Sequence, residues 1–132
     1  MPPPGRYLLD TNVLIALIAG EAPVTAAVTA ASAVFVPAIA LGELFYGAQK
    51  SGRPSQNLQA VERLSAAAAV LPCGVETARR YGELKARLRS AGTPLPENDI
   101  WIGALAVEHD LTLVSRDTHF AALPEITTVT WS

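Results

Sequence analysis

The sequence predicts an α/β domain of three layers, in which a mostly parallel sheet of five strands lies between helices. Short apolar runs alternate along the chain with longer segments of helical pattern, and strands separated by helices form parallel sheets that are covered on both faces. The length of 132 residues fits a single domain over positions 1–132. Half of the residues are apolar and 17% are charged, which is typical of a globular chain.

Two strands and three helices are expected in the first part of the chain. In order, they are a strand at 6–9, helices at 12–19 and 23–32, and a strand at 34–36. Pro37 then opens a helix that continues to about position 49. The first strand is predicted to be buried because its run is continuously apolar until Asp10. The helix that follows is expected to end at Gly20, since glycine commonly follows the last helical turn.

Three helices and three strands are expected in the remainder. The first is a helix that has Ser55 as its N-cap and continues through the alanines at 66–69. A strand at 70–71 and a helix at 76–91 follow. The last elements are a helix from Pro96 to about 109 and strands at 111–115 and 127–131. The helix at 76–91 has apolar residues at helical spacing, among them Tyr81, Leu84 and Leu88, and Gly92 is its expected stop.

Charge and cysteine content exclude several classes of protein. The net charge of −2 argues against a protein that binds nucleic acid through bulk positive charge. A single cysteine, Cys73, excludes an intramolecular disulfide framework and a Cys-based zinc cluster, and it suggests a reducing compartment. The longest apolar runs, such as 13–19, are too short to span a membrane, and the first residues do not form a signal peptide. A soluble cytoplasmic protein is therefore expected.

Four acidic residues stand in positions that favour a shared site. Asp10 and Asp117 lie where predicted strands end, and parallel sheets bind ligands outside the carboxyl ends of their strands. Glu43 is the only charged residue between positions 38 and 48, and Asp99 lies in the first turn of an otherwise apolar helix. Each position has an ordinary explanation by itself: a helix cap, an exposed edge of a helix, or a favourable interaction with the helix dipole.

Together, the four acids point to metal chemistry. Three or four carboxylates that converge at one end of a sheet repel one another, so such a cluster normally binds a cation or keeps some of its members protonated. Oxygen ligands without Cys or His favour Mg²⁺ or Mn²⁺ over Zn²⁺, and Mg²⁺ commonly engages phosphate oxygens. The natural reaction is hydrolysis of a phosphodiester by metal-activated water. Outside these four acids, ten basic residues face eight acidic ones, so the low net charge does not exclude a polyanionic substrate.

The other reactive side chains have simpler explanations. His109 suits a helix C-terminus, and His119 is more readily explained without a contact to substrate than with one. Cys73 has no basic neighbour that would lower its pKa, so an inert or core thiol is favoured. Five basic residues lie on the helix at 76–91: Arg79, Arg80, Lys85, Arg87 and Arg89. They are interpreted as a solvated face with Glu76 and Glu83 as partners rather than as a phosphate-binding surface.

The motifs around the four acids resemble the PIN-domain superfamily, and within it the VapC-type toxin ribonucleases of bacterial toxin–antitoxin pairs. The matching stretches are Leu-Leu-Asp-Thr-Asn-Val-Leu-Ile at 8–15, Pro-Ala-Ile-Ala-Leu-Gly-Glu-Leu-Phe-Tyr-Gly at 37–47, Asn-Asp-Ile-Trp-Ile-Gly-Ala-Leu-Ala at 98–106, and Leu-Thr-Leu-Val-Ser-Arg-Asp-Thr-His-Phe at 111–120. No one of these motifs is very specific, but four in order within this length are a strong signal.

The resemblance implies a doubly wound parallel sheet of five strands and an endoribonuclease that depends on Mg²⁺ or Mn²⁺, the toxin of a type II pair. It also implies an RNA substrate, a homodimer, and a cognate antitoxin that blocks the active site. By position, Asp10, Glu43, Asp99 and Asp117 would be the catalytic metal ligands, directly or through water. Thr11, Asn12 and Ser115 would support those ligands or touch substrate, and Ser115 stands where the family more often has Thr.

Two other functions stay open at this point. In the first, Asp10 is the nucleophile of a phosphatase, although the second Asp expected two positions later is Asn12. In the second, the chain is a PIN-like module that binds a partner without catalysis. The presence of all four acids speaks against the second, because a pure binding surface gains nothing from their mutual repulsion.

Overall fold

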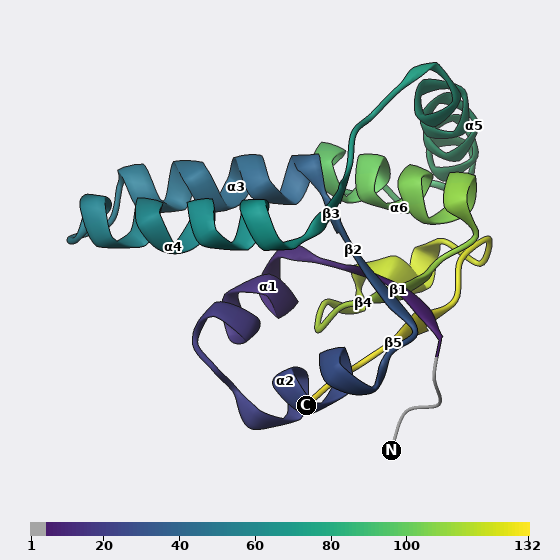
Figure 1. Ribbon diagram of the computed structural model, residues 1–132. Coiled ribbons are helices and arrows are strands. Elements are labelled where there is room, and N and C mark those ends of the chain that lie inside the picture. The colour runs from purple at the N-terminus through teal and green to yellow at the C-terminus, as the bar shows by residue number, and fades with distance from the viewer. Residues whose placement is uncertain (1–4) are drawn as a thin grey trace.

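A computed structural model describes residues 5–132 as one parallel sheet with helices on both faces (Figure 1). The strands are β1 (Arg6–Leu9), β2 (Ala33–Pro37), β3 (Ala69–Leu71), β4 (Thr112–Val114) and β5 (Thr128–Val129). The helices are α1 (Thr11–Ile18), α2 (Ala22–Ala30), α3 (Ala38–Gln49), α4 (Pro54–Ala67), α5 (Val75–Ala91) and α6 (Glu97–His109), with a short 3₁₀ helix, η1 (Thr118–Ala122), before β5. The predicted three-layer α/β class is confirmed. Residues 1–4 of the predicted domain lie outside the described residues.

The strand order places the end of β1 at the centre of the sheet. The order is β3-β2-β1-β4-β5, and each neighbouring pair is parallel. The chain adds β2 and β3 on one side of β1 and then returns to add β4 and β5 on the other side. The order therefore reverses between β1 and β4, and a parallel sheet opens a crevice beyond its carboxyl ends at such a point.

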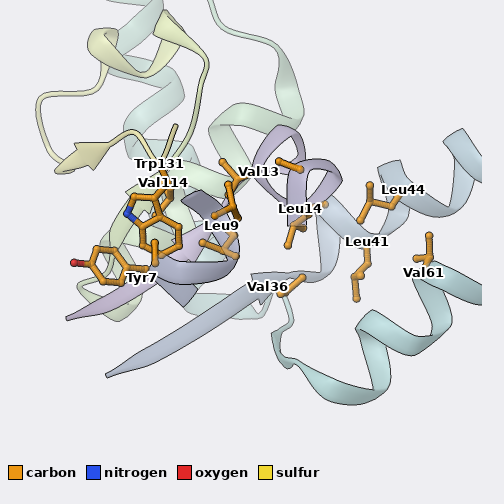
Figure 2. Packing of buried hydrophobic residues seen from close by; sticks show 14 of the residues in the cluster. Tyr7, Leu9, Val13, Leu14, Val36, Leu41, Leu44, Val61, Val114 and Trp131 are labelled. Carbon is orange, nitrogen blue, oxygen red and sulfur yellow. The ribbon is translucent and has the colours of Figure 1, made fainter. Parts of the chain in front are cut away.

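Two hydrophobic cores cover the two faces of the sheet. Alternate residues of a strand point to opposite faces, and accordingly Tyr7 and Leu9 belong to one core while Leu8 belongs to the other. Figure 2 shows the first core, where side chains of β1, β2 and α1 meet Leu41 and Leu44 of α3. The second core is built mainly from α5, α6 and the segment around η1. Residues 7–9 of β1 are buried between the two cores, which explains their apolar sequence, whereas Arg6 at the start of the strand is exposed.

The helix pair α3–α4 extends beyond the sheet on the left of Figure 1. The two helices pack along each other, and the start of α3 contacts α6 as well as α1. The first residues of α3 are therefore held close to the carboxyl ends of the central strands, while its far end packs against α4.

The predicted elements are present, and several of their boundaries differ. The helix expected to continue through 66–69 ends at Ala67, and the strand expected at 111–115 covers Thr112–Val114. The fourth helix begins at Pro54 with Arg53 at the N-cap position, rather than with Ser55 there, because the fixed φ of proline suits the first helical residue. The last strand covers only Thr128–Val129 of the predicted range 127–131. Trp131 is buried instead by an edge-to-face contact with Tyr7, at 4.9 Å between ring centroids.

Gly92 ends α5 in a left-handed conformation, and its replacement tests that stop. It has φ +69°, so Gly92→Ala is expected to lower the free energy of unfolding by about 1 kcal/mol. The matched control is Gly82→Ala, inside the same helix and exposed, with open space around a new Cβ; it should raise that free energy by about 1 kcal/mol. Urea unfolding of both variants measures the two changes. Equal changes of the same sign would contradict this explanation of the helix end.

Within residues 5–132, no single helix has both the length and the apolar character needed to cross a bilayer. The segments α1 and α2 meet that criterion of length and composition only when taken as a pair, with a bend of 105° between them.

Candidate active site

Asp10 follows β1 at the centre of the sheet and caps the N-terminus of α1. Its Oδ1 accepts a hydrogen bond from the backbone N–H of Thr11 at 2.8 Å, and its Oδ2 accepts one from the Ser115 hydroxyl at 2.7 Å. Only 5% of Asp10 is exposed. Burial raises the pKa of its carboxyl, the two hydrogen bonds oppose that rise, and the charge of Asp117 adds to it. Asp10 is thus a buried acid with a fixed orientation.

Ser115 connects the ends of β1 and β4. The residue is buried, and its hydroxyl donates to Asp10 while its oxygen accepts the backbone N–H of Asp117 at 3.0 Å. One side chain therefore orients a carboxylate on one strand end and the backbone that carries a carboxylate on the next. The structure places Ser115 where the sequence predicted a supporting residue.

Glu43 lies in the middle of α3, next to α1. The Thr11 hydroxyl donates to its Oε1 at 2.8 Å, so a residue directly after Asp10 holds Glu43 beside the end of β1. The helical spacing of α3 places Glu43 on the same face as Ile39 and Tyr46. That face is only partly enclosed, since Glu43 and Ile39 are half-buried and Tyr46 is 66% exposed.

Asp99 is in the first turn of α6 and is half-buried. Burial raises the pKa of its carboxyl, and the negative charges of Asp10 and Asp117 raise it further, whereas hydrogen bonding to His119 lowers it. Oδ2 of Asp99 lies 3.5 Å from the imidazole of His119, and Ser115 joins the turn of His119 to Asp10, so α6 brings Asp99 to the same end of the sheet as Asp10.

Asp117 and His119 belong to the turn after β4. Asp117 caps η1, and its Oδ1 accepts the backbone N–H of His119 at 2.9 Å. The imidazole Nδ1 of His119 lies 3.1 Å from Oδ1 of Asp117 and 3.5 Å from Oδ2 of Asp99. One ligand atom from each of these three residues lies within 4.8 Å of the others. A hollow of about 390 Å³ is lined by these three residues together with Glu43 and residues 96–98.

His119 is the residue that the sequence reasoning undervalued. The sequence favours an explanation of His119 without a contact to substrate, whereas the structure places its imidazole beside two of the four acids. Its position two residues after Asp117, in the first turn of a short helix, was the available signal. Such a turn brings the side chain of His119 back over the capping carboxylate.

Asn12 supports the site from outside it. Its side-chain oxygen accepts the backbone N–H of Arg116 at 3.2 Å, which ties α1 to the turn that carries Asp117. The guanidinium of Arg116 in turn pairs with Glu21 at 2.8 Å and donates to the backbone oxygen of Trp131. Asn12 thus holds the 115–117 turn.

The four predicted acids lie at the same end of the sheet: Glu43, Asp99 and Asp117 line one hollow, and the buried Asp10 acts on Asp99 through its charge. Among residues 5–132, no lysine or arginine forms an ion pair with any of the four, and His119 is the basic side chain that contacts Asp99 and Asp117. The donors are predominantly carboxylate oxygens, which suit a hard divalent cation. Burial is the main cause of the raised pKa values of Asp10 and Asp99, and the charges of neighbouring carboxylates add to it; a bound cation would favour the ionised form of both acids.

The basic helix α5 is largely neutralised by its neighbours. Arg79 and Arg80 pair with Glu76, Lys85 pairs with Glu97 at 2.6 Å, and Arg87 pairs with Glu125. These pairs agree with a solvated face, although the partners beyond Glu76 come from other segments and not from Glu83. Exposed pairs of this kind contribute little to stability.

Cys73 is exposed, so a place in the core was the wrong expectation for it. Partial burial of its thiol and the nearby charge of Glu108 raise its pKa, which disfavours the reactive thiolate.

Comparison with known proteins identifies the family. The chain matches the PIN domain over residues 7–126. It is 33% identical over 114 residues to Ribonuclease VapC2 of Haemophilus influenzae, covering 85% of this chain and 86% of that protein. It is 30% identical to the tRNA(fMet)-specific endonuclease VapC of Salmonella typhimurium over 129 residues, covering 96% and 98%. The crystal structure of DNA-bound VapBC from Salmonella typhimurium superposes with a TM-score of 0.91 at 30% identity, covering 96% of this chain and 98% of that one. The chain therefore belongs to the PIN-domain family and, within it, to the VapC ribonucleases.

Proposed function

We propose that the chain is an endoribonuclease that depends on Mg²⁺ or Mn²⁺ and acts as the toxin of a toxin–antitoxin pair. The observation that carries the proposal is the meeting of four carboxylates, from β1, α3, α6 and the turn after β4, at the point where strand order reverses. The related ribonuclease and endonuclease chains indicate RNA as the substrate. One continuous sheet with a core on each face supports a single domain over 1–132.

In this proposal Asp10, Glu43, Asp99 and Asp117 hold the metal. A divalent cation there supplies positive charge that polarises the scissile phosphate and favours ionisation of water. The chain's own task is to keep the carboxylates in place before RNA arrives. Thr11 does this for Glu43 and Ser115 for Asp10, and Asn12 holds the turn that carries Asp117.

The geometry disfavours Asp10 as a phosphatase nucleophile. Both of its carboxylate oxygens already accept hydrogen bonds, and the residue is almost completely buried. Each oxygen keeps a lone pair that can bind a cation, but an attacking oxygen must also reach phosphorus in line from the open side of the site, and Asp10 does not line that hollow. The hollow of the site is instead lined by Glu43, Asp99, Asp117 and His119, so a phosphate would approach from that side.

An antitoxin is the proposed protein partner. The solved relatives include VapBC of Salmonella typhimurium and VapBC-1 of Haemophilus influenzae. They also include VapBC-5 of Mycobacterium tuberculosis, a member of the VapBC family of toxin–antitoxin systems. A groove of about 360 Å³ between α1, α3 and α4 supports this partner, because it contains exposed Ile15 and Ile18 and also includes Thr11 and Glu43. A segment bound there would adjoin the acidic site. A homodimer remains a prediction, as does a location in the cytoplasm, where RNA is present and a lone thiol stays reduced.

Metal-dependent cleavage of RNA by the purified chain tests the proposed function. Total RNA is incubated with the protein in Mg²⁺, in Mn²⁺ or in EDTA, and the new RNA ends are mapped. Discrete cuts that require a divalent ion and that disappear when the antitoxin is co-purified are expected. Cleavage that persists in EDTA, or a phosphorylated intermediate trapped on Asp10, would contradict the proposal.

Ser115 contacts Asp10 but is not one of the proposed metal ligands, so its replacement tests how much the orientation of Asp10 matters. Ser115→Ala is expected to reduce cleavage by about 10- to 100-fold, because Asp10 loses the donor that orients it. Ser115→Thr keeps the hydroxyl and is expected to retain most activity, so it is the matched control. Initial cleavage rates at saturating metal measure both. Equal losses in the two variants would show that packing around residue 115, rather than its hydroxyl, is what matters.

A further inference from the structure

We propose that His119 is a direct ligand of the metal that Asp99 and Asp117 hold, so that the site contains a nitrogen donor and prefers Mn²⁺ to Mg²⁺. The inference rests on the proposed metal-dependent function and adds to it a ligand and an ion preference.

The separation of the ligand atoms supports direct coordination. Neighbouring donors around an octahedral ion with bonds of about 2.1 Å lie about 3.0 Å apart. The Nδ1 of His119 lies 3.1 Å from Asp117 Oδ1 and 3.5 Å from Asp99 Oδ2, and one ligand atom of each residue lies within 4.8 Å of the other two. Small side-chain adjustments would therefore place all three donors around a single cation.

The backbone holds the imidazole in this position. The N–H of His119 donates to Asp117 Oδ1 at 2.9 Å in the first turn of η1, which ties the residue to the carboxylate that it accompanies. The next residue, Phe120, is buried in the second core and anchors the turn. The ring is 53% exposed, at the edge of the hollow, so the metal can reach Nδ1 without opening the fold.

Nitrogen changes which ion the site prefers. Mg²⁺ favours oxygen donors and retains several waters, whereas imidazole is a good ligand for transition-metal ions. Two carboxylates and an imidazole therefore favour Mn²⁺ over Mg²⁺ more than an all-carboxylate site would. The competing interpretation is that His119 is an imidazolium paired with the two carboxylates, which a cation would displace.

The chain contains only two histidines, which makes a spectroscopic test decisive. Pulsed electron paramagnetic resonance of the Mn²⁺-loaded protein, in a buffer without nitrogen ligands, is expected to show coupling to an imidazole nitrogen. His119→Ala should lose this coupling. His109→Ala should keep it, because His109 lies at the other end of α6 and contacts Glu108. Circular dichroism of both variants checks that they are folded.

Binding measurements test the ion preference. By titration, His119→Ala is expected to bind Mn²⁺ about 10-fold more weakly while its affinity for Mg²⁺ changes much less, so the ratio of the two affinities falls. Two results would overturn the inference: no nitrogen coupling in the Mn²⁺-loaded wild type, or an equal loss of affinity for both ions in the variant. In either case, RNA cleavage that requires a divalent ion would still support the proposed function. If the wild type binds neither ion and cuts RNA in EDTA, the proposed function is overturned as well.

Discussion

Asp99→Asn is expected to reduce RNA cleavage by more than about 100-fold. The side chain keeps its shape but loses the negative charge that would hold the cation, and even residues that only support metal ligands cost about 10- to 100-fold when removed. Asp99 lies with Asp117 and His119 at the hollow of the site, so the loss falls where the metal is proposed to bind. Cleavage rates over a range of Mg²⁺ and Mn²⁺ concentrations measure the effect, and expression of the variant should no longer inhibit growth.

Asp110→Asn is the matched control for this change. It makes the same substitution in the residue that follows the same helix, at an exposed position with φ +52°, a conformation that asparagine also adopts. Its cleavage rate should stay close to that of the wild type. Full activity of Asp99→Asn would remove the metal site from the proposed function.

The same variant has an expected effect on stability in EDTA. The pKa of Asp99 is raised above its ordinary value of 3.8, first by burial and then by neighbouring acids. The folded protein therefore binds this proton more tightly than the unfolded chain does, and the resulting stability is present below about pH 3.8 and is lost as the pH rises through the raised pKa. Asn does not ionise, so at pH 7 without metal the variant should unfold at a higher temperature than the wild type. The difference should vanish near pH 3, and added Mn²⁺ should stabilise the wild type more.

Ile15→Glu is expected to weaken antitoxin binding by at least about 30-fold, which corresponds to a loss of about 2 kcal/mol at a binding hot spot. Ile15 is 56% exposed and lines the groove between α1, α3 and α4. A new carboxylate there would have to be desolvated by any apolar segment that binds. Because the side chain already faces solvent, the fold and RNA cleavage should be unaffected. Affinity for the purified antitoxin and growth during co-expression measure the effect.

Val75→Glu is the control for the groove. Val75 is 70% exposed at the start of α5 and does not line the groove, so the same added charge should leave antitoxin binding unchanged. If both substitutions weaken binding equally, general charge rather than the groove is responsible. If neither does, the antitoxin binds elsewhere.

The sequence predicted most of the fold because buried parallel strands and their stops have strong local signals. The apolar run at 6–9 and the glycine at position 92 are read from neighbouring residues alone. The end of the chain was less predictable. Trp131 continued an apolar pattern that suggests a strand, yet its burial comes from Tyr7, which is distant in sequence.

The candidate site was predictable to a similar degree and for similar reasons. The positions of Asp10 and Asp117 follow from the rule for strand ends, and the structure places both there. The hydrogen bonds between Thr11 and Glu43 and between Ser115 and Asp10 join residues far apart in the chain, so no local pattern specified them. His119 was undervalued because its significance depends on Asp99, which another helix brings to it.

Thr11 and Glu43 line the apolar groove and also stand beside Asp10, so the two sites share residues. A partner segment that moves Thr11 or Glu43 when it binds in the groove would change the affinity of the acidic site for its cation, and thermodynamic reciprocity requires that the cation then change the affinity for the partner by the same factor. The supply of divalent ions would thereby adjust how tightly the proposed antitoxin is retained. Release of the toxin would answer to metal homeostasis as well as to destruction of the inhibitor.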